Sequence, residues 1–132
     1  MIVPVLVDDW QMDCCGTRPV LGARVSWTLN WTPWYAERVP TAMRLRARLE
    51  PGRFSWTCEN PEVVPAIARV GGVSVYVPAP APLAEEIVLT GVLHEDHHDG
   101  APPETPLTTG LITALRRLEH ATLVDLDVLL SD

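Results

Sequence analysis

The sequence predicts an all-β protein with mainly antiparallel strands. We expect a small barrel of the SH3-like or OB-like kind, or a β-sandwich, with room for one short helix. Three observations predict this class: apolar and polar residues alternate in several short runs, turn signals separate the runs, and 13 prolines disfavour long helices. The chain of 132 residues has the length of one domain, so we expect residues 1–132 to form a single β-rich domain.

The first third of the chain predicts two strands separated by a loop. Residues 1–8 are apolar and rich in β-branched side chains, which is typical of a strand. Residues 8–17 are polar and predict a loop. Alternation over 23–29 predicts a half-buried strand, and the tryptophans and prolines of 30–40 indicate an irregular connection.

The next segment, residues 43–49, is open to two interpretations. As a strand it places Arg44, Arg46 and Arg48 on one face and apolar side chains on the other. As a helix it consists of good helix formers and ends before a Pro-Gly pair. We favour the strand because the alternation is unbroken, and residues 53–58 alternate again.

A glycine pair marks a β-hairpin in the middle of the chain. Gly71 and Gly72 separate β-branched runs at 66–70 and 73–77, and glycine suits both positions of a two-residue turn. The remaining expected elements are a Pro-Ala linker over 78–82, a strand over 86–93, a long loop over 94–109, a strand or short helix over 111–118, and a strand over 122–130.

Two clusters of chemically active side chains each follow a predicted strand. The first, residues 8–16, contains acids and adjacent cysteines, and the second, residues 94–99, contains three histidines and three acids. Thiolate and imidazole together suit Zn²⁺, and nearby carboxylates can orient the imidazoles. We expect Cys14, Cys15, His97 and His98 to be the metal ligands, with Asp8, Asp9, His94 and Asp96 as supporting or alternative ligands.

The spacing of the cysteines leaves a second interpretation open. Structural zinc sites usually separate two cysteines by two residues, whereas adjacent cysteines in an extended chain point in different directions. Both can bind one ion only in a tight turn, which Gly16 favours. Otherwise one cysteine packs in the core and the histidine run is a solvated loop.

These residues favour a binding or accessory module whose zinc-like metal or small-ligand site lies between the loops at 8–15 and 94–99. An alternative is a small enzyme at the same site, with a bound metal or a cysteine as the reactive group and His97 or His98 as the base. A third is an interaction protein with no site. The sequence contains no nucleophile elbow, phosphate loop or dinucleotide fingerprint, so whether it is an enzyme stays open.

The three arginines at 44, 46 and 48 also allow two interpretations. They suit an anion such as a phosphate or carboxylate. Alternatively they form an exposed face that pairs with an acidic strand, for which Asp125 and Asp127 have the matching period. We favour the second interpretation.

Charge and hydropathy limit the partners. A net charge of −7 disfavours nucleic acid, and no segment has the roughly 18 uninterrupted apolar residues of a membrane helix. Three cysteines and the lack of a basic leader at residues 1–7 favour a cytoplasmic protein. The partner, a small molecule or a protein, is not defined by the sequence, and exposed strand edges would allow a homodimer.

Several of these residues also carry a resemblance. Residues 7–12, Val-Asp-Asp-Trp-Gln-Met, and 14–16, Cys-Cys-Gly, resemble an actinobacterial family of small proteins with a domain of unknown function. An acidic His-His segment at 95–98 and Thr109-Gly110 match the same family. The resemblance covers the first quarter and about residues 88–113. It implies no activity, but it implies that the two clusters belong to one pattern.

Overall fold

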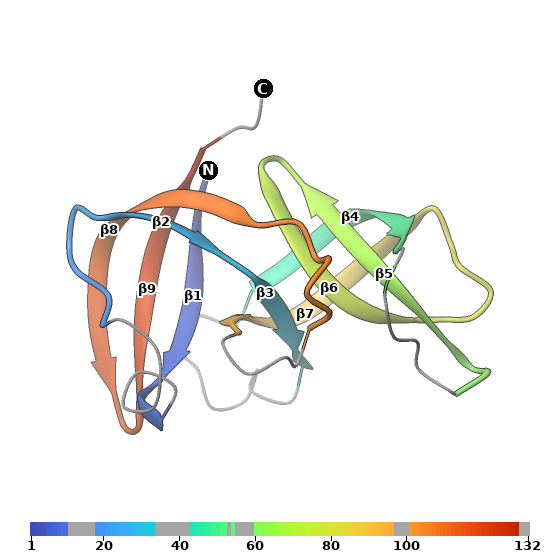
Figure 1. The fold of residues 1–132 in the computed structure, drawn as a ribbon, viewed down its shortest axis with the longest axis horizontal. Helices are drawn as coiled ribbons and strands as arrows, with labels where there is room; N and C mark the ends of the chain where they lie inside the picture. The colour runs from blue at the N-terminus through green and yellow to red at the C-terminus, as the bar shows by residue number, and fades with distance from the viewer. Residues whose placement is uncertain (11–17, 34–42, 53, 55–59, 97–100, 130–132) are drawn as a thin grey trace.

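The computed structural model describes residues 1–10, 18–33, 43–52, 54, 60–96 and 101–129. These residues form nine β-strands (Figure 1), which confirms the predicted all-β class. The strands are β1 (Ile2–Asp8), β2 (Arg24–Trp27), β3 (Leu29–Thr32), β4 (Met43–Pro51), β5 (Val63–Val70), β6 (Val73–Pro80), β7 (Glu86–Glu95), β8 (Thr108–Leu118) and β9 (Ala121–Val128). Both ambiguous segments, 43–49 and 111–118, are therefore strands.

The strands form one sheet that closes on itself in part. Its order is β2-β8-β9-β1-β7-β3-β6-β5-β4, and β4 also pairs with β7. Strands β7, β3, β6, β5 and β4 thus close into a five-stranded barrel, and β1, β9, β8 and β2 extend the sheet from β7 (Figure 1). The pairings are antiparallel except for β1 with β7 and β3 with β6. A small barrel was one of the two predicted architectures.

Apolar side chains pack on both faces of the strands near β7. The main core includes Val5 of β1, Val75 of β6, Leu93 of β7 and Leu126 of β9, each at most 1% exposed. Burial of each such side chain contributes about 1.5–3 kcal/mol. A smaller cluster on the other face of β1 and β7 consists of Leu6, Val92, Ala121 and Leu123. Strands β1 and β7 are consequently fixed from both sides.

The glycine pair forms the predicted turn between β5 and β6. Val70 pairs with Val73, and Gly71 has a φ of 56°, which is strained for residues with a Cβ. A Cβ at Gly72 would lie 2.5 Å from the carbonyl oxygen of Leu129. The turn therefore requires glycine for its conformation at one position and for space at the other.

Some predicted connections turn out to be parts of strands. Residues 78–80 of the expected linker continue β6, residues 30–32 belong to β3, and the expected loop at 94–109 loses two residues to β7 and two to β8. Residues 78–80 pair with 63–65 at the far end of the predicted hairpin. The other ends are held by pairing with strands that the sequence alone does not identify. The predicted strand at 53–58 lies outside the described residues except for Phe54. No helix of the described residues is long and apolar enough to cross a membrane.

Candidate functional site

The ends of β1 and β7 bring the two sequence clusters together. These strands are parallel, with Val5 opposite Leu93 and Leu6 opposite His94. Parallel strands run in the same direction, so the chain leaves both at the same end of the sheet. Asp8 is the last residue of β1 and Glu95 the last of β7.

A histidine and an aspartate make the direct contact between the clusters. Nε2 of His94 lies 2.5 Å from Oδ2 of Asp8, and the two side chains are 13% and 12% exposed. On the other side of the ring, Nδ1 lies 3.3 Å from Oγ1 of Thr32, which comes from β3. A carboxylate only accepts, so Nε2–H donates to Asp8, and in the neutral ring Nδ1 then accepts from the Thr32 hydroxyl. His94 is thereby oriented from both sides.

Glu95 lies on the opposite face of β7 from His94. Alternate residues of a strand share a face, so Glu95 faces the same side as Leu93 of the main core, and it is 2% exposed. Burial, and to a smaller extent the nearby charges of Asp96 and Asp8, together raise the pKa of Glu95 to about 8. The sequence predicted no role for Glu95 beyond its place in the acidic His-His segment.

The other two supporting acids are held by different partners. Asp9 pairs with Arg117 of β8, and hydrogen bonding to this guanidinium lowers the pKa of the Asp9 carboxyl. Asp96 donates its backbone N–H to the carbonyl oxygen of Thr28, and its Oδ2 accepts from the N–H of Ala101 at 3.0 Å. Of the four supporting or alternative ligands, Asp8 and His94 contact each other.

The four predicted metal ligands, Cys14, Cys15, His97 and His98, lie outside the described residues. Among the residues that the structure describes, no three histidine, cysteine or acidic side chains converge to hold a metal ion. The metal site stays a prediction.

The sequence also predicted no role for Thr32, because only the pairing of β3 with β7 places this residue beside His94.

A comparison with known protein families identifies the family of this chain. Residues 1–128 match DUF6578, a family of unknown function. The chain belongs to this family. No curated protein and no solved structure gives a significant match. The expected membership of a family of unknown function is thus confirmed for this DUF6578 protein.

The arginines at 44, 46 and 48 of this DUF6578 protein, here called the arginine stripe, do not have the partners that the sequence indicated. The expected pairing with Asp125 and Asp127 is wrong, because β4 lies between β5 and β7 and not beside β9. Asp127 instead lies 3.6 Å from the amino group of Met1. The guanidinium groups of the stripe pair with closer acids: Arg46 with Glu86, and Arg48 with Glu50.

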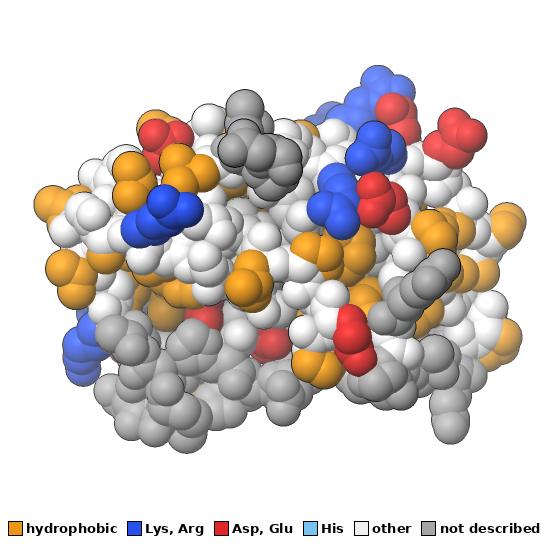
Figure 2. Space-filling view, turned by 45° about the horizontal axis from the view of Figure 1, so that its top comes forward, with side chains coloured by type: hydrophobic (Ala, Val, Ile, Leu, Met, Phe, Trp, Pro, Cys, Tyr) orange, Lys and Arg blue, Asp and Glu red, His pale blue; other side chains and the backbone are white. Residues whose placement is uncertain are grey.

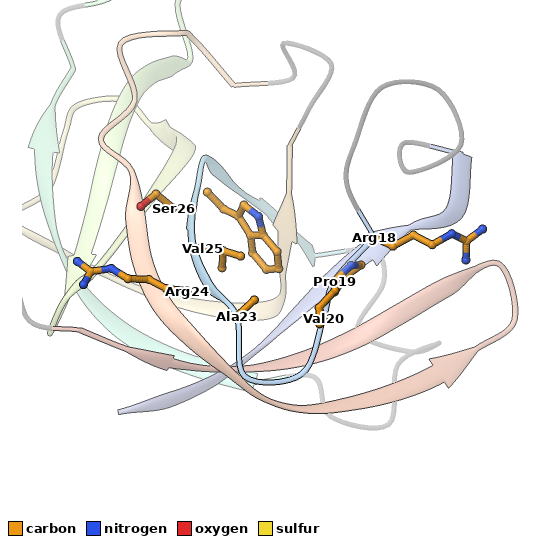
Figure 3. A pocket seen from close by; sticks show the side chains of 8 residues that line it. Arg18, Pro19, Val20, Ala23, Arg24, Val25 and Ser26 are labelled. Carbon is orange, nitrogen blue, oxygen red and sulfur yellow. The ribbon is translucent and has the colours of Figure 1, made fainter.

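A cavity of about 340 Å³ lies along residues 18–20 and 23–27 of this DUF6578 protein. In Figure 3, Arg18 and Arg24 extend outward on opposite sides, while Ala23 and Val25 lie along the segment between them. The hydroxyl of Ser26 is already bonded to that of Thr109 at 2.7 Å. The cavity is mainly apolar and shares no residue with the contact between Asp8 and His94.

Proposed function

We propose that this protein is a binding or accessory module that holds a transition-metal ion at the end of the sheet where β1 and β7 finish. The ion that fits the proposed ligands, Cys14, Cys15, His97 and His98, is Zn²⁺, because it accepts both thiolate and imidazole. A small ligand at the same place is the broader form of the proposal.

The observation that carries the proposal is the contact between Asp8 and His94. It joins the first acidic cluster directly to the histidine cluster, at 2.5 Å and with both side chains largely buried. Cys14 follows Asp8 by six residues and His97 follows Glu95 by two, which are distances that the chain can span at about 3.3–3.6 Å per residue. The tethering of both clusters to one end of the sheet supports a joint site.

The charge at this end also supports a cation. The carboxylates of Asp8 and Asp96 lie near enough to Glu95 to act on it electrostatically. A concentration of carboxylates attracts cations and can accept hydrogen bonds from metal-bound imidazoles. Asp8 already serves such an orienting role towards His94.

Cobalt titration tests the metal proposal. The protein is stripped with a chelator, and Co²⁺ is added while thiolate-to-cobalt absorption is recorded. We expect saturation at one equivalent, loss of the band in the Cys14→Ser, Cys15→Ser double variant, and an unchanged band in the matched Cys58→Ser variant. The double variant His97→Gln, His98→Gln is expected to weaken cobalt binding. Its matched control is His120→Gln, which changes an exposed histidine on the β8–β9 turn.

Zinc itself provides the second measurement. Elemental analysis after Zn²⁺ loading and dialysis is expected to give one equivalent, and bound zinc is expected to raise the unfolding temperature. Retention below about a tenth of an equivalent, with no change of stability on chelation, would reject the metal proposal. The proposal also fails if the double cysteine variant binds as well as Cys58→Ser.

A second candidate function is a small enzyme at the same end. One observation favours it: His94 lies between the hydroxyl of Thr32 and the carboxylate of Asp8, the order of a nucleophile, a base and its orienting acid. Hydrolysis of an activated ester separates the candidates. An enzyme predicts turnover that falls in Thr32→Val and stays constant in Thr90→Val, an exposed threonine of β7. Equal rates in both variants contradict this candidate.

A further inference from the structure

Two arginines face each other directly on neighbouring strands of the barrel. Arg48 of β4 and Arg69 of β5 are opposite partners in the antiparallel register. Like charges at directly opposite positions destabilise a sheet. Both guanidinium groups bind one carboxylate, with Arg69 Nε at 2.7 Å from Oε2 of Glu50 and Arg48 Nη2 at 3.2 Å from Oε1. The group of three side chains keeps one net positive charge.

Hydrogen bonds fix the guanidinium of Arg69, while other N–H groups of Arg48 and Arg69 stay available to a ligand. Nη1 of Arg69 donates to Oγ of Ser74 at 3.0 Å, and Ser74 is buried. Hydrogen bonding to Arg69 lowers the pKa of Glu50, so this carboxyl is ionised at neutral pH. Within the described residues no acceptor contacts Nη2 of Arg69 or Nη1 of Arg48. These donors are positioned in advance of any ligand, which lowers the entropy cost of binding.

The two arginines line a cavity of their own. It has a volume of about 460 Å³ and lies between Arg48, Glu50, Arg69 and Gly71. Figure 2 shows arginine side chains gathered with acidic ones at the upper right of the molecule, in contrast to the apolar and neutral surface around them. The cavity therefore combines space, positive charge and available N–H donors.

The neighbouring charges of β4 add to this positive region. Arg46 is neutralised by Glu86, whereas Arg44 is exposed and has no ionic partner among the described residues. The four arginines and the two glutamates that pair with them sum to two positive charges, although the whole chain carries −7. The region is a local exception in an acidic protein.

We propose that Arg48 and Arg69 form a binding site for a phosphate group, either inorganic phosphate or a phosphate monoester. Planar guanidinium groups bind phosphate oxygens through pairs of N–H donors, and a dianion balances the excess charge of this face. The sequence also predicted an anion as one possible ligand, but for the arginines at 44, 46 and 48. The site proposed here uses a different pair of residues, because Arg69 comes from β5 and Arg46 is held by Glu86. The site shares no residue with the proposed metal site.

Nuclear magnetic resonance tests this site with inorganic phosphate as the probe. Phosphate is titrated at constant ionic strength against chloride, and the Nε–Hε signals of the arginines and the amide of Gly71 are followed. We expect saturable shifts confined to Arg48, Arg69 and Gly71. Glycerol phosphate is titrated in the same way, and tighter binding than that of inorganic phosphate identifies a monoester as the ligand source.

Two variants and one matched control decide the outcome. Arg48→Gln removes an exposed side chain and is expected to keep the fold while weakening phosphate binding about tenfold or more, the effect of losing a charge-assisted hydrogen bond. Arg69→Gln should weaken it further, and Arg24→Gln, an exposed arginine of β2, should have no effect. Shifts that chloride produces equally, or an affinity for phosphate that is unchanged in Arg48→Gln, overturn the proposal, as does equal weakening in Arg24→Gln.

Discussion

Glu95 allows a quantitative prediction of how stability depends on pH. Its side chain is 2% exposed, and burial raises its pKa from 4.5 to about 8 in the folded protein. In the unfolded chain the group ionises near 4.5, so above that pH the folded state retains a proton that the unfolded state has lost. Stability contributed by protonated Glu95 is therefore complete below about pH 4.5, falls as the pH rises, and is lost above about pH 8.

The magnitude follows from the difference between the two pKa values. A difference of about 3.5 units at 1.36 kcal/mol per unit amounts to a loss of about 5 kcal/mol between pH 4.5 and 8. About 3 kcal/mol of this is lost by pH 7. Glu95→Gln keeps the size of the side chain but cannot ionise, so this variant should become more stable than the wild type as the pH rises.

Urea denaturation between pH 5 and 9, in the presence of a chelator, measures this difference. We compare the free energies of unfolding of the wild type, Glu95→Gln and Glu62→Gln, which changes an exposed glutamate before β5. Subtraction cancels the titration of all other groups. The stability difference should grow with pH for Glu95→Gln and stay flat for Glu62→Gln. A flat difference for Glu95→Gln would falsify the assignment of a protonated, buried carboxyl.

Three further substitutions test the packing of the sheet by chemical denaturation. Leu126→Ala empties a fully buried site in β9 and is expected to cost about 2–5 kcal/mol, whereas the exposed Leu107→Ala should cost little. Thr108→Val removes the hydroxyl that bonds both the N–H and the carbonyl oxygen of Ser74, and should cost about 1–3 kcal/mol. Gly72→Ala forces a Cβ against the backbone of Leu129 and should cost about 1–3 kcal/mol, so unchanged stability would contradict the tight turn.

Alternation predicted the strands well because it records which face of each strand is buried. In β4 the apolar residues at 45, 47 and 49 are buried while the alternating arginines at 44, 46 and 48 are exposed, as the unbroken pattern predicted. The helical alternative for 111–118 depended on an apolar face, yet Leu111 and Leu115 are 39% and 42% exposed on β8. Proline as a breaker misled the prediction for 78–80, where Ala79 stays buried between two exposed prolines.

Neighbour relations between strands could not be predicted in the same way. The idea that the two clusters meet depended on β1 and β7 being adjacent, and the sequence contains no signal for a pairing between residues 6 and 94. For the same reason the predicted partners of the arginine stripe were wrong. Its actual partners are Glu86, which lies on the neighbouring strand β7, and Glu50, which lies on β4 itself. Local patterns determine elements, whereas long-range register determines sites.

The position of β1 in the sheet has a consequence for how the protein is made. Its two neighbours are β7 and β9, so β1 is synthesised well before the strands with which it pairs, residues 86–95 and 121–128. Until β7 and β9 have been synthesised, the apolar side chains of β1 have no neighbouring strand against which to pack. Pairing across such sequence separations also slows folding, to the millisecond-to-second range typical of β-proteins. Chaperones that shield an apolar N-terminal segment should therefore increase the yield of folded protein.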